Sequence, residues 1–198
     1  MKSRFARFGA LVLALLMLAS LLASCGSKEE EETAAEEATT TVVFPANYYD
    51  YFDYSPSEDV DSLKELGTDY YTKVSKKGNT LVITATEAQI RKLIARNNYY
   101  CSEAQNAFLG AGDGYSITGA DDYTEVEFVL NEKMDEETRD TCILTILNAY
   151  AMNQFLKGAG EDDWSIKVTF YNSDTGDKIT SAKIPDEDLV LSTDDLAA

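Results

Sequence analysis

The sequence predicts a single α+β domain over residues 42–191, with a largely antiparallel sheet built from hairpin–helix units and two main helices packed on one face. Two observations lead to this prediction. Three stretches with paired runs of alternating apolar and polar residues predict β-hairpins, and long helical patterns follow the first two of them. About 150 residues are also ample for one hydrophobic core.

The domain is expected to open with an aromatic segment between Val42 and Ser57. Five of its aromatic residues stand among acidic ones: Tyr48, Tyr49, Tyr51, Phe52 and Tyr54. They could form an exposed strip that stacks on sugar rings or on a partner peptide. Alternatively, the segment wraps the domain and buries its rings, which suits tyrosine because its hydroxyl can stay hydrogen-bonded when the ring is partly buried.

A short helix is predicted next, over residues 59–66. Residues 70–74 and 80–86 then predict the first hairpin. Thr86 and Gln89 fit a capping box, which predicts that the first long helix begins directly after this hairpin.

The second hairpin is expected at residues 115–118 and 123–130. Asp135 is a suitable N-cap for the helix that follows, and the two acidic residues after it favour the positive end of the helix dipole. This helix, to about Lys157, is apolar around much of its girth. We therefore expect it to be the central element of the core.

The third hairpin has the clearest alternation, over residues 164–171 and 179–184. Pro185 then ends the second of these strands, since proline cannot donate to a sheet ladder. Residues 192–198 are predicted to form a loose tail.

The N-terminus has the organisation of an export signal over residues 1–24. Lys2, Arg4 and Arg7 precede the apolar residues 8–22, which include no acidic side chain. This stretch is shorter than the about 20 residues of a typical membrane span, and its basic flank is typical of a secretory signal.

The leader ends in Leu22-Ala23-Ser24-Cys25. This sequence resembles the lipobox of bacterial lipoproteins. The resemblance implies diacylglyceryl transfer to Cys25, cleavage after Ser24, and a lipid-anchored location on the extracytoplasmic face of a bacterial cell membrane. An ordinary signal peptide with a chance cysteine is the alternative. Residues 25–41 would then be the lipidated cysteine followed by a disordered acidic tether, because they include almost no large apolar side chain.

Charge and composition exclude several classes of partner and chemistry. Without the three basic residues of the leader, 14 of the 17 Lys and Arg residues remain against 35 Asp and Glu, a net charge of −21. Such a chain is not expected to bind nucleic acid, whose affinity depends on neutralised phosphates. The chain has no histidine, which excludes Ser-His-Asp and Cys-His catalysis and the commonest metal ligand. We expect no metal, no cofactor and no catalytic activity.

Two cysteines remain beyond the leader, Cys101 and Cys142. An oxidising compartment would allow them to form a disulfide. Both lie on apolar helix faces, however, where a free cysteine behaves as a small hydrophobic residue. Buried thiols are therefore the default expectation.

One group of basic residues stands out from the acidic background, at positions 73–96, where Glu87 is the one acidic residue. The group consists of Lys73, Lys76, Lys77, Arg91, Lys92 and Arg96. It could be a partner surface for an anionic wall polymer or for the acidic face of another protein. It could equally be a solvated set of charges that neutralises the field of the protein itself.

Together these features favour a lipid-anchored, extracytoplasmic, non-catalytic domain that binds a protein or a cell-envelope component. Two alternatives stay open: a small hydrolase that uses paired carboxylates, and an accessory ligand-binding lipoprotein of a transporter. A deep cleft with two converging acids would favour the hydrolase, and a pocket would favour the ligand-binding subunit.

Overall fold

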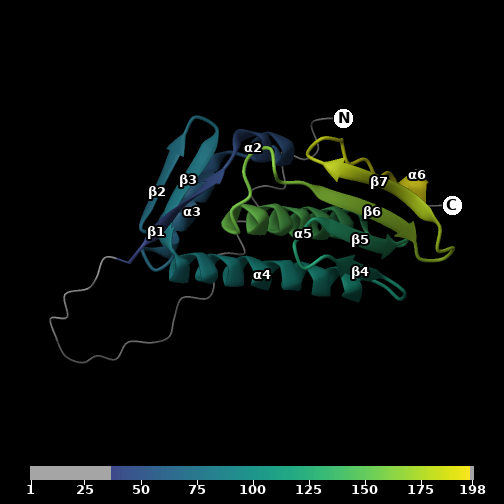
Figure 1. Ribbon diagram of the computed structural model, residues 1–198. Coiled ribbons are helices and arrows are strands. Elements are labelled where there is room, and N and C mark those ends of the chain that lie inside the picture. Colours follow the sequence, from purple (N-terminus) through teal and green to yellow (C-terminus); the bar gives the residue numbers. More distant parts are fainter. Residues whose placement is uncertain (1–36, 197–198) are drawn as a thin grey trace, which may run out of the picture.

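The computed structural model describes residues 37–196; the export signal, Cys25 and most of the predicted tether lie outside the described residues. The described chain is a single α+β domain, as predicted (Figure 1). Its elements are β1 (Thr39–Phe44), α2 (Ala46–Phe52), α3 (Pro56–Leu66), β2 (Lys73–Lys77), β3 (Thr80–Thr86), α4 (Glu87–Gly110), β4 (Ser116–Gly119), β5 (Glu125–Leu130), α5 (Glu136–Leu156), β6 (Ile166–Asn172), β7 (Lys178–Ile184) and α6 (Thr193–Leu196).

The strands form two sheets, where the sequence predicted one. The smaller sheet has the order β1-β3-β2 and is antiparallel throughout. The larger sheet has the order β4-β5-β6-β7, with antiparallel outer pairs and a parallel pair of β5 and β6 at its centre. The parallel pair follows from the connection, because α5 carries the chain back along the sheet before β6 begins.

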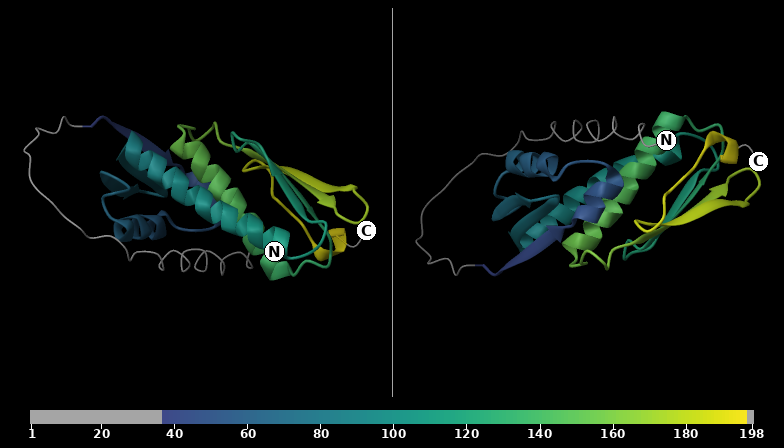
Figure 2. Two further views of the ribbon diagram at one scale, coloured as in Figure 1. Left: turned by 90° about the horizontal axis from the view of Figure 1, so that it is seen from below. Right: turned by 90° about the horizontal axis from the view of Figure 1, so that it is seen from above.

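The two long helices α4 and α5 lie side by side and run antiparallel (Figures 1 and 2). The four-stranded sheet covers one side of this pair, and the three-stranded sheet lies near the first half of α4 (Figure 2). Helix α5 is the centre of the core, as predicted, since Ile146, Leu147 and Ala151 are fully buried. None of the helices within residues 37–196 is long and apolar enough to cross a membrane.

The predicted capping box starts α4. The Thr86 hydroxyl accepts a hydrogen bond from the Gln89 backbone NH at 3.2 Å, and the Gln89 side chain accepts one from the Thr86 NH at 2.8 Å. These two bonds satisfy donors that the first turn of a helix would otherwise leave unpaired.

A cluster of amide side chains joins the middle of α4 to α5. Asn97 Nδ2 donates to the Ala149 carbonyl at 2.7 Å and to Asn153 Oδ1 at 2.9 Å. Asn153 Nδ2 donates in turn to Asn98 Oδ1 at 2.7 Å. Asparagine in a helix often competes for its own backbone. Here these amides bond across the interface, and α4 continues unbroken past them.

The domain begins earlier than predicted. Thr39, Thr40 and Thr41, which the prediction placed in the tether, form the first half of β1 and pair with residues 84–86 of β3. These β-branched side chains suit a strand, and the partner strand satisfies their backbone groups.

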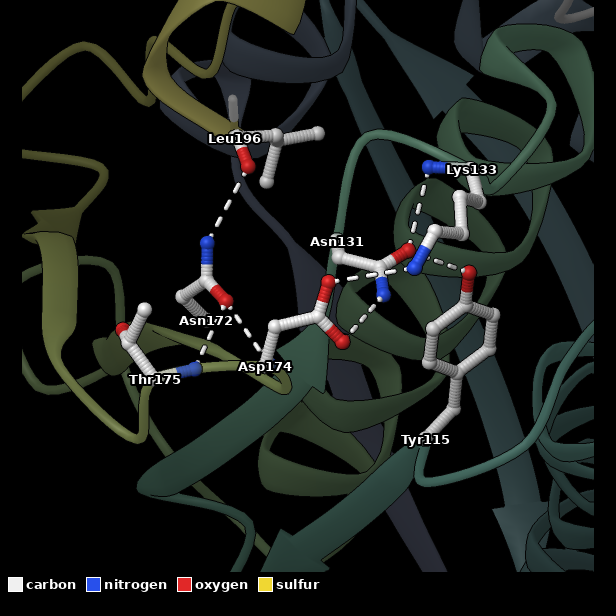
Figure 3. A network of polar contacts seen from close by, with 7 residues as sticks. All are labelled: Tyr115, Asn131, Lys133, Asn172, Asp174, Thr175 and Leu196. Carbon is white, nitrogen blue, oxygen red and sulfur yellow. Dashed lines mark hydrogen bonds and ion pairs between the residues drawn. The ribbon is translucent and has the colours of Figure 1, made fainter. Parts of the chain in front are cut away.

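The predicted loose tail is also wrong for the residues that the structure describes. Leu196 in α6 is fully buried, and its carbonyl accepts a hydrogen bond from Asn172 Nδ2 at 3.1 Å. The side-chain oxygen of Asn172 accepts hydrogen bonds from the backbone NH groups of Asp174 and Thr175 in the adjacent turn (Figure 3). A neighbouring network includes Tyr115, Asn131, Lys133 and Asp174. Helix α6 is therefore docked through a buried amide at the β6–β7 turn.

Both cysteines of the domain are buried and free. The disulfide between Cys101 and Cys142 is not formed, and the expectation of buried thiols is confirmed. Burial raises the pKa of the Cys101 thiol to about 11, which keeps it protonated and unreactive near neutral pH.

Candidate functional site

A cavity of about 1060 Å³ lies between the helices of the described chain. Side chains of helices α2, α3, α4 and α5 line it, together with those of the chain segment 188–191. Its wall is largely hydrocarbon and includes Phe52, Leu66, Ile143, Leu144, Met152 and Leu189. Small-molecule sites typically occupy about 300–1,000 Å³ and are lined mainly by apolar side chains. The cavity matches that description in size and in chemistry.

Helix α3 forms one wall of the cavity. Ser55 caps the helix by accepting a hydrogen bond from the Ser57 NH at 3.3 Å, and Pro56 supplies the first turn. The buried face carries Val60 and Leu63, and α3 packs on β2 and β3. The helix ends at Gly67, where φ is 81°, so that the chain can turn into β2. This anchoring leaves Leu63 at the cavity wall.

The aromatic segment forms helix α2 and is not an exposed strip. Tyr48 and Tyr49 are fully buried, and Tyr51, Phe52 and Tyr54 are half-buried against the core. The Tyr48 ring lies 5.4 Å from the Phe155 ring, centroid to centroid. The interpretation in which this segment buries its rings is therefore confirmed.

Asp59 in the first turn of α3 lies at the cavity wall and at the centre of a tyrosine cluster, which we define as Tyr48, Tyr49 and Tyr54. Its Oδ2 atom accepts a hydrogen bond from the Tyr49 hydroxyl at 2.8 Å and from the Tyr54 hydroxyl at 3.4 Å. The single proton of the Tyr54 hydroxyl is shared between Asp59 and the Tyr48 hydroxyl, and Tyr48 donates to Asn148 Oδ1 on α5 at 2.9 Å. A chain of hydrogen bonds therefore links α3 to α5 along the cavity wall.

The cluster has an unusual acid–base state. Burial raises the pKa of Asp59 from 3.8 to about 6, and the hydrogen bonds from the tyrosines offset part of this rise. Burial and the charge of Asp59 hold the pKa values of all three tyrosines above the usual value. Near neutral pH the cluster thus has one negative charge, on Asp59, surrounded by neutral hydroxyl donors.

The charges at the cavity wall are predominantly acidic. The acidic residues are Asp50, Asp53, Asp59, Asp140 and Asp188, and among the described residues the one basic side chain of the wall is Arg96. The Arg96 guanidinium lies over the Tyr100 ring, 5.1 Å from its centroid. Asp50, Asp53 and Asp188 are exposed, whereas Asp59 and Asp140 are half-buried. Acids therefore outnumber bases at this wall, which favours a negative potential there.

The predicted basic group is divided over several parts of the structure. Successive side chains of a strand point to opposite faces, so Lys73 and Lys77 lie on one face of β2 and Lys76 on the other. Lys76 Nζ donates to Ser57 Oγ on α3 at 2.8 Å. On α4, Arg91 pairs with Glu87, whereas Arg96 lies at the cavity. Lys92 is exposed.

Residues 37–196 include no group of three or more His, Cys, Asp or Glu side chains that could hold a metal ion. Asp59, the most enclosed carboxylate of the wall, has tyrosine hydroxyls as its hydrogen-bond partners. The site therefore offers hydrogen bonding and a negative charge inside a hydrocarbon wall.

Comparison with protein-family models, with curated proteins and with solved structures gave no match.

Sequence reasoning did not single out Asp59. It is one of 35 acidic residues, and its local pattern is that of an ordinary helix start. The sequence offered one indirect signal. Asp59 follows within a few positions of five aromatic residues, and its two hydrogen-bond partners come from that segment.

Proposed function

We propose that this chain is a lipid-anchored, extracytoplasmic, non-catalytic domain whose cavity binds a small amphiphilic envelope ligand. The cavity of about 1060 Å³ carries this proposal. Of the three hypotheses that the sequence leaves open, a pocketed domain best suits the accessory ligand-binding lipoprotein.

The apolar wall provides the driving force for binding. Burying hydrocarbon contributes about 25 cal/mol per Å² removed from water. Leu66, Leu144 and Met152 are half-buried, so a ligand with a hydrocarbon body would cover surface that water now reaches. The polar groups near Asp59 would orient the other end of the ligand.

The wall is less suited to hydrolysis. Sugar-cleaving enzymes place two carboxyl groups about 5–9.5 Å apart across a polar cleft. Here the hydrogen bonds of Asp59 go to tyrosines, and the surrounding surface is mostly hydrocarbon. We therefore favour binding over catalysis.

The lipobox resemblance supports the proposed location. A predicted tether of about a dozen residues has a reach of roughly 20 Å as a flexible coil. Such a length would keep the cavity near the surface of the bilayer, where amphiphilic molecules collect and where a membrane transporter could receive them.

Photo-crosslinking tests the proposed binding site. The full chain, in nanodiscs of phosphatidylcholine, is irradiated with a long-chain alcohol that includes a diazirine, and labelled peptides are mapped by mass spectrometry. We expect labels on α3 and on residues 143–152 of α5, and competition by the unlabelled alcohol. The variant Leu144→Arg places a charge in the wall and should reduce labelling at least fivefold.

The matched control is Tyr99→Arg on the outer surface of α4, where the tyrosine is 59% exposed. It should leave labelling unchanged. Labels scattered over exposed surfaces, with no effect of Leu144→Arg, would contradict the proposed site.

A further inference from the structure

We infer that the ligand is a long-chain amine, and that its ammonium group pairs with Asp59 while its hydrocarbon chain fills the cavity. This inference rests on the proposed function, and it adds the charge and the chemical class of the ligand. Charge complementarity between the wall and an ammonium group is the observation that supports it.

The wall strongly favours a cation over an anion. Five of its side chains are aspartates, and the charge of Arg96 is already placed over the Tyr100 ring. Asp140 has a partner, since its Oδ1 accepts from Arg139 Nε at 2.8 Å. An anionic head such as a carboxylate would be repelled by the remaining acids, whereas an ammonium would be attracted to them.

Asp59 is the best placed of these acids to bind the ammonium. Its Oδ2 atom accepts from the Tyr49 hydroxyl at 2.8 Å and shares the Tyr54 proton with Tyr48, and the carboxylate is ionised above its pKa of about 6. An ionised carboxylate can accept about four hydrogen bonds, so two tyrosine donors leave capacity for an ammonium group. The Asp59 carboxylate is therefore held in position before a ligand binds, which lowers the entropic cost of binding.

An aromatic ring next to this carboxylate also favours a cation. Tyr54, whose hydroxyl lies 3.4 Å from Asp59 Oδ2, contributes to the same wall, as does Tyr51. The faces of such rings attract ammonium groups, and aromatic cages are a recurrent means of binding them. A carboxylate among tyrosines is thus suited in two ways to an amine.

The dimensions favour a small molecule over a helical peptide. A helix with its side chains is about 10–12 Å wide and needs a groove that is open along its length. Side chains from four helices, from the strands β1, β3 and β6, and from the segment 188–191 line this cavity. A single hydrocarbon chain can enter such a space end-on.

The test compares three photoactivatable probes with the same 14-carbon chain and diazirine, ending in an ammonium, a hydroxyl or a carboxylate. They are applied at pH 7.5 to the full chain in nanodiscs of phosphatidylcholine. The concentration for half-maximal labelling of the cavity peptides is measured for each probe. We expect the ammonium probe to label at about tenfold lower concentration than the hydroxyl probe, and the carboxylate probe to label most weakly.

The variant Asp59→Asn tests the role of the carboxylate, because its amide oxygen can still accept the tyrosine hydrogen bonds. The advantage of the ammonium over the hydroxyl should fall to less than twofold. The control Asp61→Asn changes an acid on the same helix whose side chain is 73% exposed, and it should keep the full advantage. If Asp59→Asn does not fold, the comparison of the three probes on the unaltered protein still decides the outcome.

Equal labelling by all three probes would overturn the charge inference and leave the proposed function standing. Absence of cavity labelling by every probe would overturn both. Stronger displacement by a cationic amphipathic peptide than by an unlabelled long-chain amine would overturn the assignment to a small ligand.

Discussion

At the scale of single residues, Asp59 links the stability of the fold to pH. Its pKa is about 6 in the folded protein against 3.8 for the ordinary carboxyl, because burial disfavours the charged form. A raised carboxyl pKa means that the folded protein binds the proton more tightly than the unfolded chain. The stabilisation from this proton is fully present below about pH 3.8 and is lost as the pH rises through about 6.

Asp59→Asn should remove this pH dependence. Between pH 4 and pH 7 the free energy of unfolding of the unaltered protein should fall by up to about 3 kcal/mol relative to the variant, since one pKa unit corresponds to about 1.4 kcal/mol. Denaturant unfolding at several pH values measures the difference. The exposed-site variant Asp61→Asn should parallel the unaltered protein. A constant difference between Asp59→Asn and the unaltered protein across this range would contradict the raised pKa.

At the scale of elements, the contact between α4 and α5 depends on neutral amides. Asn153 is fully buried and bonds to both Asn97 and Asn98. Replacing Asn153 removes both of these bonds, although Asn97 keeps its bond to the Ala149 carbonyl. Each lost partner of a buried polar group costs about 1–3 kcal/mol.

We therefore expect Asn153→Ala to reduce the free energy of unfolding by roughly 2–6 kcal/mol, since two such bonds are lost. Asn106→Ala, at an exposed position of the same helix pair, should change it by less than about 0.5 kcal/mol. Denaturant unfolding compares the two variants with the unaltered chain. Similar losses in both variants would show that the amide cluster has no special role.

The elements with regular patterns were the ones that the sequence could predict. The capping box at Thr86 and the apolar side chains on most sides of α5 are local signals. In the structure the capping box starts α4, and α5 lies at the centre of the core. Strand β1 was missed because its composition continues that of the predicted tether and its partner strand β3 is distant in the chain.

Helix α2 was missed for a similar reason. It has seven residues, and helices that short depend on tertiary contacts. Asn47 supplies such a contact: its side chain accepts from Trp164 Nε1 at 3.1 Å and donates to the Glu161 carbonyl at 3.0 Å. No local pattern around residue 47 indicates these distant partners.

At the scale of the whole molecule, the cavity could not be predicted because four helices and a C-terminal segment contribute to it. Its wall residues lie between positions 44 and 191 of the chain. The hairpin patterns also gave no sign that β5 and β6 would pair in parallel, since that pairing depends on where α5 returns the chain. Which residues line a cavity of this kind depends on how distant segments pack together, and the local sequence does not show it.

The proposed anchor acts on the whole molecule and is tested at Cys25. Mass spectrometry of the protein isolated from the membranes of its natural host should find a chain that begins at residue 25 with a lipid on the thiol. The variant Cys25→Ser should lose this modification and the cleavage that depends on it, while Cys101→Ser should keep both. An unmodified Cys25 in the natural product would contradict the anchor.

The amides that join α4 to α5 carry no ionisable proton, whereas the wall they support is lined by titratable groups. Acidification or added salt would therefore change which ligand charge the cavity wall favours, without weakening the hydrogen bonds between α4 and α5. In this molecule, the charge preference of the cavity can change while the packing of its two longest helices stays the same.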